Sequence, residues 1–350
     1  MRARTKLAIT LAAPFLGLVL AELVVRAGGW RALPQPRATG AVFREIADSP
    51  LRFMNIPNGE QRIRYERGES EAALEVVARV NAQGFRGPLV LERKPADVLR
   101  IACIGDSHTF GYGVGEGETW PDVLRTSLAE HASAQRVEVL NCGVNAYDTE
   151  QEALFLEEHV LRFEPDLVLV QFYMNDTAIR DLPGAPAPDP DFWLALAHPW
   201  RQGFVRTLRE RSRFVDLVLS NVYRRRHLAQ FGRDRVNLFA DDSPGWIRCR
   251  AALVRMRDRL RASETRFAVV LFPFLFAAGE HLASHEPFAS VSRFCADEGI
   301  ACFDFESDFE GRDLEALRVH PLDYHANAAG HRVFGEAVAR EIVRANLVPR

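Results

Sequence analysis

The chain has 350 residues, of which 47% are hydrophobic and 26% charged, and its formal net charge is −3. This composition is typical of a folded protein with one large core or two modest ones, and it excludes an intrinsically disordered chain. The charge balance gives no indication of nucleic-acid binding, and five cysteines are too few for a disulfide scaffold of this length.

Residues 1–26 are predicted to be an N-terminal membrane anchor or signal segment. Three basic residues precede a mostly apolar run, Leu7 to Val25, which Glu22 interrupts near its end. About 19 helical residues nearly span a hydrocarbon core, and a basic flank keeps the N-terminus inside. The alternative is a cleaved signal peptide, because Val19-Leu20-Ala21 places small residues at suitable positions. We expect an anchored protein whose remaining domain lies outside the cytoplasm, in the periplasm or at the cell exterior.

Residues 27–96 are predicted to form a juxtamembrane arm. The segment is rich in proline and contains short stretches of alternating polarity, one of them Ala73 to Val80. That stretch leads into Asn81-Ala-Gln-Gly-Phe-Arg-Gly, a typical turn sequence. We therefore expect a few strands that end at the turn Gln83-Gly84.

From residue 97 to 347 short apolar runs alternate with helical periods. The runs are Val98 to Ile104, Val137 to Leu140, Leu167 to Tyr173, Phe267 to Phe276 and Ile300 to Phe305. Helical stretches lie near 118–134, 149–163, 247–263, 287–298 and 327–345. Continuous apolar strands separated by helices predict an α/β fold. We expect a three-layer α/β/α sandwich around a five-stranded, mostly parallel sheet, with active groups beyond the carboxyl ends of the strands.

The alternation breaks between the third and fourth strands, which predicts a helical insertion over about 177–246. Residues 201–266 contain 17 arginines against 7 acidic residues. An arginine-rich helical face is often merely solvated, but it can also contact anionic lipid headgroups or an acidic glycan. An insertion at this edge of the sheet can act as a lid or a substrate platform.

The predicted strand ends carry residues suited to nucleophilic catalysis. Ser107 follows the first strand in Gly105-Asp-Ser-His, where a strand-to-helix turn exposes the hydroxyl and a backbone N–H. The second strand leads into Asn141-Cys-Gly-Val-Asn-Ala-Tyr-Asp-Thr, and Asn175 follows the third. His325 lies just before the last helix. No His, Cys, Asp or Glu cluster has metal-ligand spacing and no phosphate-binding glycine loop is present, so we expect neither a metal nor a cofactor.

These four segments, in this order, resemble the SGNH/GDSL hydrolase superfamily of serine esterases and acyltransferases, whose fold is flavodoxin-like. The resemblance covers roughly residues 97–345, and the arm with its N-terminal segment resembles a membrane-anchored bacterial branch. It implies that Ser107 is the nucleophile and His325 the general base. It also implies an oxyanion hole formed by the Ser107 and Ala146 backbone amides and the Asn175 side chain.

Two positions depart from the family pattern. Ala146 stands where the family has a glycine, and alanine tolerates positive φ poorly. The triad acid is usually three residues before the histidine, where this chain has Leu322. Asp323 is therefore the expected acid, with Asp304, Asp308 or a backbone carbonyl as alternatives.

These residues predict a serine esterase that acts on an acyl ester, with an envelope or exported acylated glycan or lipid as substrate. The same site would also serve an O-acyltransferase in which a polysaccharide hydroxyl replaces water. A third hypothesis is an inactive module that binds glycan or lipid through the arginine-rich insertion. The oligomeric state cannot be inferred from the sequence.

Overall fold

The structure is a computed structural model of the 350-residue chain. It describes residues 2–30, 36–47, 49–66, 72–131, 136–177, 204–222, 238–275, 285–321 and 323–348. The chain divides into two compact units, one formed by Met1–Gln35 with Pro188–Phe231 and the other by Pro36–Ala187 with Gly232–Arg350.

The larger unit is built around a five-stranded sheet in the order β5-β4-β6-β7-β8. All four neighbouring pairs of strands are parallel, which confirms the α/β fold class. The central strands β4 and β6 are buried along their whole length, as expected for strands covered on both faces. The strands are β4 (Val98–Gly105), β5 (Arg136–Gly143), β6 (Leu167–Phe172), β7 (Arg266–Leu271) and β8 (Ala301–Asp304).

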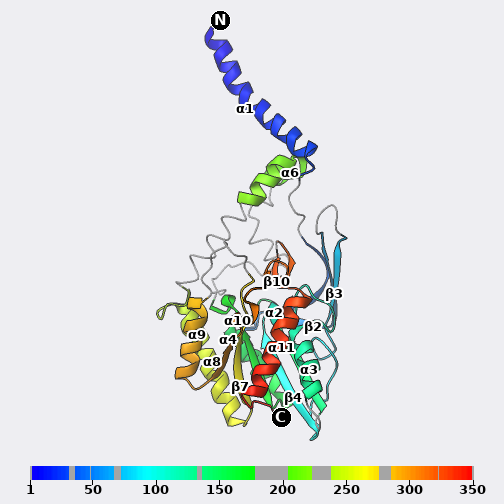
Figure 1. The fold of residues 1–350 in the computed structure, drawn as a ribbon, viewed down its shortest axis with the longest axis vertical. Coiled ribbons are helices and arrows are strands. Elements are labelled where there is room, and N and C mark those ends of the chain that lie inside the picture. The colour runs from blue at the N-terminus through cyan, green and yellow to red at the C-terminus, as the bar shows by residue number, and fades with distance from the viewer. Residues whose placement is uncertain are drawn as a thin grey trace. The chain divides into compact units, whose positions relative to one another are not determined.

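Helices pack in pairs against this sheet (Figure 1). α3 lies against α11, and α4 lies against α8. Because crossovers between parallel strands are right-handed, these two pairs cover opposite faces, which gives the expected three layers. The helices are α3 (Trp120–His131), α4 (Thr149–Phe155), α8 (Pro244–Ala262), α9 (His285–Asp297), α10 (Glu306–Phe309) and α11 (Ala328–Arg344). Much of the predicted insertion, residues 178–203 and 223–237, lies outside the described residues.

The predicted arm contains a three-stranded antiparallel sheet, β1-β2-β3, and belongs to the larger unit. Its strands are β1 (Arg37–Glu45), β2 (Phe53–Tyr65) and β3 (Leu74–Arg79). Val42 and Ala78 of the arm pack in one core cluster with Phe110, which follows the nucleophile candidate closely. The Asn55 side chain donates to the carbonyl oxygen of Gly143, at the end of β5, over 2.9 Å. The arm is therefore packed directly against the strand ends that carry the expected site.

A buried arginine connects the arm to the loop that follows β4, the first strand of the five-stranded sheet in chain order. Arg86, in the turn that begins at Asn81, is 3% exposed. Its guanidinium donates to the carbonyl oxygens of four residues and to the Glu116 carboxylate. The four carbonyl groups are those of Phe110, Gly111, Val114 and Gly115. Because a guanidinium offers five N–H donors in a rigid fork, one side chain fixes the path of this whole loop.

The smaller unit contains α1 (Arg2–Ala27) and α6 (Phe204–Arg211), followed by a helix over 213–222. Glu22 of α1 accepts hydrogen bonds from the Ser212 hydroxyl and from the amides of Arg213 and Phe214, at the start of that helix. These contacts and Arg26 lower the pKa of Glu22 to about 2, although desolvation opposes them.

The prediction of a transmembrane helix finds no support in the described part of the chain. None of the helices there combines the length and the apolar character needed to cross a bilayer. Glu22, which interrupts the apolar run, accepts hydrogen bonds from protein donors, and an ionised carboxylate is costly to bury in hydrocarbon.

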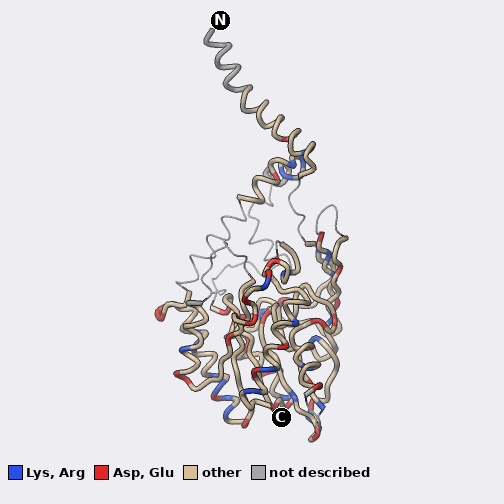
Figure 2. Tube along the Cα trace, in the orientation of Figure 1, with Lys and Arg blue, Asp and Glu red and all other residues tan. Residues whose placement is uncertain are grey.

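Most arginines of α8 are paired with carboxylates. Basic and acidic residues are interspersed along the helices of the larger unit (Figure 2). Arg250 pairs with Asp241, Arg255 with Glu157, and Arg257 with Asp258 and Glu298. In this helix the arginine excess is thus largely met by carboxylates of the same unit.

Replacing Arg86 with alanine is expected to lower the free energy of unfolding by about 3–5 kcal/mol, because several buried carbonyl groups would lose their donor. Urea unfolding followed by circular dichroism measures this loss. Arg79→Ala is the matched control, since Arg79 is about half exposed and pairs with Glu60 at the surface. That variant should lose no more than about 1 kcal/mol. Equal losses in both variants would show that Arg86 does not have the proposed structural role.

Candidate active site

Ser107 lies directly beyond the carboxyl end of β4, at the first position of the short helix α2 (Ser107–Phe110). Asp106 caps this helix, because its Oδ1 accepts from the His108 amide over 2.8 Å. The neighbouring strand approaches α2 so closely that a Cβ on Gly143 would overlap the Phe110 amide nitrogen. Because Gly143 has no Cβ, the backbone of α2 can pack directly against the end of β5.

A continuous chain of hydrogen bonds connects Ser107, His325 and Asp323. The distance from Ser107 Oγ to His325 Nε2 is 2.8 Å, and that from His325 Nδ1 to Asp323 Oδ1 is 2.6 Å. A carboxylate only accepts, so Nδ1 carries the proton and Nε2 is free to accept the serine proton. The three side chains have the geometry of a nucleophile, a general base and an orienting acid.

The spacing of Asp323 and His325 is explained by local strand geometry. Both residues lie in β10 (Asp323–Ala326), which pairs with β9 (Arg318–His320). Side chains two residues apart in a strand point to the same side, so an acid two positions before the histidine can still reach its ring. The alternative acids are engaged elsewhere: Asp304 accepts from the Glu306 amide and Asp308 pairs with Arg340.

Electrostatics in this pair favour a charged acid and a more basic histidine. Burial alone would raise the pKa of Asp323, but the positive charge and hydrogen bonds of His325, with a hydrogen bond from Tyr65, lower it below its ordinary value. Burial alone would lower the pKa of His325, but the Asp323 carboxylate raises it above its ordinary value. The pair is therefore arranged to stabilise an imidazolium once the serine proton has moved.

Asn175 and Ala146, the expected oxyanion donors, each follow the carboxyl end of a strand of the five-stranded sheet. Asn175 is in the 3-10 turn after β6, and its Nδ2 donates to Asp106 Oδ2 over 2.8 Å. This bond anchors the amide beside the serine turn and leaves its second proton for another acceptor. Ala146 follows β5 with a φ of 70°. The alanine thus adopts the left-handed conformation in which the family has glycine, and no hydrogen bond within the described residues engages its amide.

Aromatic rings pack around the imidazole of His325. The ring of Tyr112 is 5.0 Å from it and that of His108 is 4.8 Å from it, both measured between centroids. Burial, with the nearby His325 and His331, holds the pKa of His108 well below its ordinary value. His108 is therefore neutral and packs beside the base without repelling its positive form.

The sequence did not reveal one residue that touches the site. Tyr65, the last residue of β2, donates its hydroxyl to Asp323 Oδ2 over 3.2 Å. A single tyrosine at a buried strand position predicts a core residue, and its partner is 258 positions away. Only the alternation of buried residues toward the end of β2 could have shown that its ring faces inward.

Comparison with known proteins shows the family of the chain. Residues 103–333, more than half of the chain, match the GDSL-like Lipase/Acylhydrolase family. The chain belongs to this family. It is accordingly a hydrolase of ester bonds, as the sequence predicted.

This GDSL hydrolase is also similar to solved structures. One is an acetylxylan esterase from Geobacillus stearothermophilus, with 15% identity and a TM-score of 0.43 over 70% of this chain and 94% of that one. Another is the lipase/acylhydrolase from Enterococcus faecalis, with 17% identity and a TM-score of 0.43 over 72% and 98%. Comparison with curated protein sequences gave no match.

The pH dependence of ester hydrolysis should follow the raised pKa of His325. Activity requires the neutral imidazole, so kcat/KM should be lost as the pH falls through a midpoint above about 6.5. Asp323→Ala should move this midpoint to lower pH, because the charge that raises the pKa is removed. Asp308→Ala, the control, should leave the midpoint unchanged. A shift of the midpoint to lower pH in Asp308→Ala but not in Asp323→Ala would show that Asp323 is not the acid of the triad.

Replacing Ala146 with glycine should raise the free energy of unfolding by about 0.5–1 kcal/mol, because glycine adopts positive φ without strain. Catalytic activity should be retained, since the backbone amide remains. The control is Ala153→Gly in the buried face of α4, which should lose about 1–2 kcal/mol through lower helix propensity and the loss of a buried methyl group. Thermal and urea unfolding measure both, and a destabilised Ala146→Gly variant would contradict the argument from strain.

Proposed function

We propose that this GDSL hydrolase is a serine esterase that cleaves its substrate through a covalent acyl-Ser107 intermediate. The observation that carries this proposal is the unbroken chain of contacts from Ser107 Oγ through His325 to Asp323, at 2.8 Å and 2.6 Å. A serine hydroxyl is a weak nucleophile at its ordinary pKa and needs an adjacent base to activate it. Here the base is in contact with the serine and the acid is in contact with the base.

In the first step Ser107 Oγ attacks the ester carbonyl carbon while His325 Nε2 takes the hydroxyl proton. The carbonyl oxygen becomes an oxyanion and is stabilised by the amides of Ser107 and Ala146 and by the Asn175 side chain. The carbon–oxygen bond to the alcohol then breaks, and the imidazolium returns its proton to the leaving oxygen. Water repeats the sequence on the acyl-serine, which releases the acid and restores the serine.

We further propose that the substrate is an acylated glycan or lipid of the cell envelope or of exported material. This part rests on the sequence, namely on the resemblance to the anchored bacterial branch, and the location outside the cytoplasm likewise stays a prediction. An acyl-serine can pass its acyl group to a sugar hydroxyl as well as to water. The acceptor therefore distinguishes an esterase from an O-acyltransferase. The complete set of triad contacts favours both over an inactive binding module.

The decisive experiment is active-site labelling with a fluorophosphonate, which forms a bond to the serine oxygen and releases fluoride. The wild type should label, and Ser107→Ala should not label while retaining its fold by circular dichroism. Asn175→Ala should label slowly and lower kcat for p-nitrophenyl acetate by roughly 100- to 1000-fold, because one oxyanion donor is lost. Labelling of the Ser107→Ala variant would exclude Ser107 as the nucleophile.

A matched control and a second acceptor complete the design. Ser263→Ala, at the surface end of α8, should label and turn over like the wild type. Hydrolysis of p-nitrophenyl acetate is then repeated with a neutral oligosaccharide as a possible acceptor. Release of acetate at an unchanged rate supports the esterase. Faster consumption of the ester with acetylated sugar as product would contradict it and indicate a transferase.

A further inference from the structure

The N-terminal arm supplies a buried hydroxyl to the proposed triad acid. Tyr65 closes β2, is fully buried, and its Oη lies 3.2 Å from Asp323 Oδ2. We propose that Tyr65 is a positioning residue that holds the Asp323 carboxylate in the orientation in which it can orient His325. The inference rests on the proposed function of the triad and adds to it a residue from outside the region that matches the family.

The two oxygens of Asp323 have different partners. Oδ1 accepts from His325 twice, from the backbone amide over 3.1 Å and from Nδ1 over 2.6 Å. Oδ2 accepts from Tyr65. The torsion that rotates a carboxylate about its Cβ–Cγ bond is broad and only weakly restrained by intrinsic preference. Contacts to one oxygen leave this rotation open, whereas a donor on the second oxygen fixes the plane of the group.

The backbone at Gly113 also lies close to the hydroxyl of Tyr65. A Cβ on Gly113 would approach it to 2.8 Å, so no side chain fits between this loop and the ring. Gly113 lies in the loop whose carbonyl groups Arg86 holds on either side, at Gly111 and Val114. Asp323 therefore meets a hydroxyl whose position is set by two separate segments of the chain.

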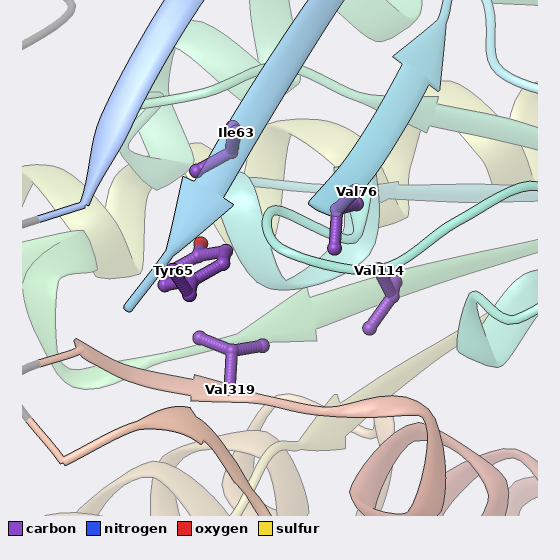
Figure 3. Packing of buried hydrophobic residues seen from close by; sticks show 5 residues of the cluster. All are labelled: Ile63, Tyr65, Val76, Val114 and Val319. Carbon is purple, nitrogen blue, oxygen red and sulfur yellow. The ribbon is translucent and has the colours of Figure 1, made fainter. Parts of the chain in front are cut away.

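Packing fixes the ring of Tyr65 itself. Figure 3 shows five side chains that converge from the arm strands β2 and β3, from the loop after α2 and from β9, the strand before the triad acid. They are Ile63, Tyr65, Val76, Val114 and Val319. The ring of His320 lies 5.8 Å from that of Tyr65, and its Nε2 is 3.0 Å from the carbonyl oxygen of Glu66. The β9–β10 hairpin that carries Asp323 and His325 is thus docked onto the end of β2.

Burial also keeps the hydroxyl protonated. Desolvation and the negative charge of Asp323 raise the pKa of Tyr65 well above its ordinary value. The phenol therefore remains a neutral donor throughout the pH range in which the esterase would work. Its contribution to Asp323 does not vary with pH.

The test is a double-mutant cycle with Tyr65→Phe and Asp323→Ala, using p-nitrophenyl acetate turnover and the rate of fluorophosphonate labelling. Phenylalanine keeps the ring and removes the hydroxyl. Tyr65→Phe should lower kcat roughly 10- to 100-fold at unchanged KM, as expected for one hydrogen bond to a charged group. Asp323→Ala should lower kcat by about 1000-fold or more. The double variant should be no slower than Asp323→Ala, because the hydroxyl acts only through the carboxylate.

Val76→Ala is the matched control, since it opens the same core cluster without touching Asp323. It should reduce thermal stability and leave kcat close to that of the wild type. Any small effect of Val76→Ala on kcat should add to the effect of Asp323→Ala. A Tyr65→Phe variant with wild-type kcat, or one whose effect adds fully to that of Asp323→Ala, would overturn the proposal.

Failure of the proposed function gives a different result. If Ser107 is not the nucleophile, Ser107→Ala labels as fast as the wild type, or the wild type does not label. If only the positioning role fails, the wild type labels at Ser107 and Tyr65→Phe labels at the same rate. The rate of labelling therefore distinguishes the two failures. It can be measured even for variants whose turnover of p-nitrophenyl acetate is too slow to follow.

Discussion

The candidate site depends on the hydrogen bonds that stabilise one largely buried carboxylate, that of Asp323. An ionised Asp323 placed inside the protein is unfavourable unless donors replace the water that it loses. Three donors do so, two from His325 and one from Tyr65, and together with the histidine charge they keep the acid ionised despite its burial. The same negative charge fixes the proton on His325 Nδ1. The other ring nitrogen is then directed toward Ser107 as an acceptor.

The arm has a larger structural role than a spacer between an N-terminal segment and a domain. It contacts both halves of the site, through Tyr65 at the acid and through Arg86 at the loop that follows the nucleophile helix. Asn55 adds a contact to Gly143, beside the loop that carries the oxyanion candidate Ala146. A rigid site requires side chains that are themselves held in place. In this chain much of that support comes from residues that precede β4, the first strand of the five-stranded sheet in chain order.

The sequence predicted the parts of the molecule that local patterns determine. Apolar runs separated by helical periods gave the five strands and their parallel arrangement, and the strand-end rule brought Ser107, Asn175 and His325 together. Asp323 could be found because it is two positions from its partner. Tyr65 could not be found in this way, because its partner is 258 positions away. Arg86 could not be found either, because backbone carbonyl groups have no sequence signature. Such long-range contacts depend on how the arm docks, which no local pattern encodes.

The N-terminal helix shows the same limit in another form. Its hydropathy is a property of residues taken singly, whereas the state of Glu22 depends on the helix that begins at residue 213. A carboxylate at the start of a helix is favoured by the free amides there and by the helix dipole. Its low pKa follows mainly from these contacts, with a smaller part from Arg26 one helical turn away. Composition alone does not show that this charge is stabilised by a distant segment.

Ala146 shows how a strained position can be retained in a site. Its positive φ is unfavourable for a residue with a β-carbon. The residues that follow it are strongly fixed: the Tyr147 hydroxyl donates to the Phe53 carbonyl oxygen over 2.6 Å, and Asp148 forms a capping box with Gln151 at the start of α4. These contacts determine the backbone on one side, and the end of β5 determines it on the other. Because alanine has fewer backbone conformations than glycine, the strain is partly offset by a smaller loss of conformational freedom on folding.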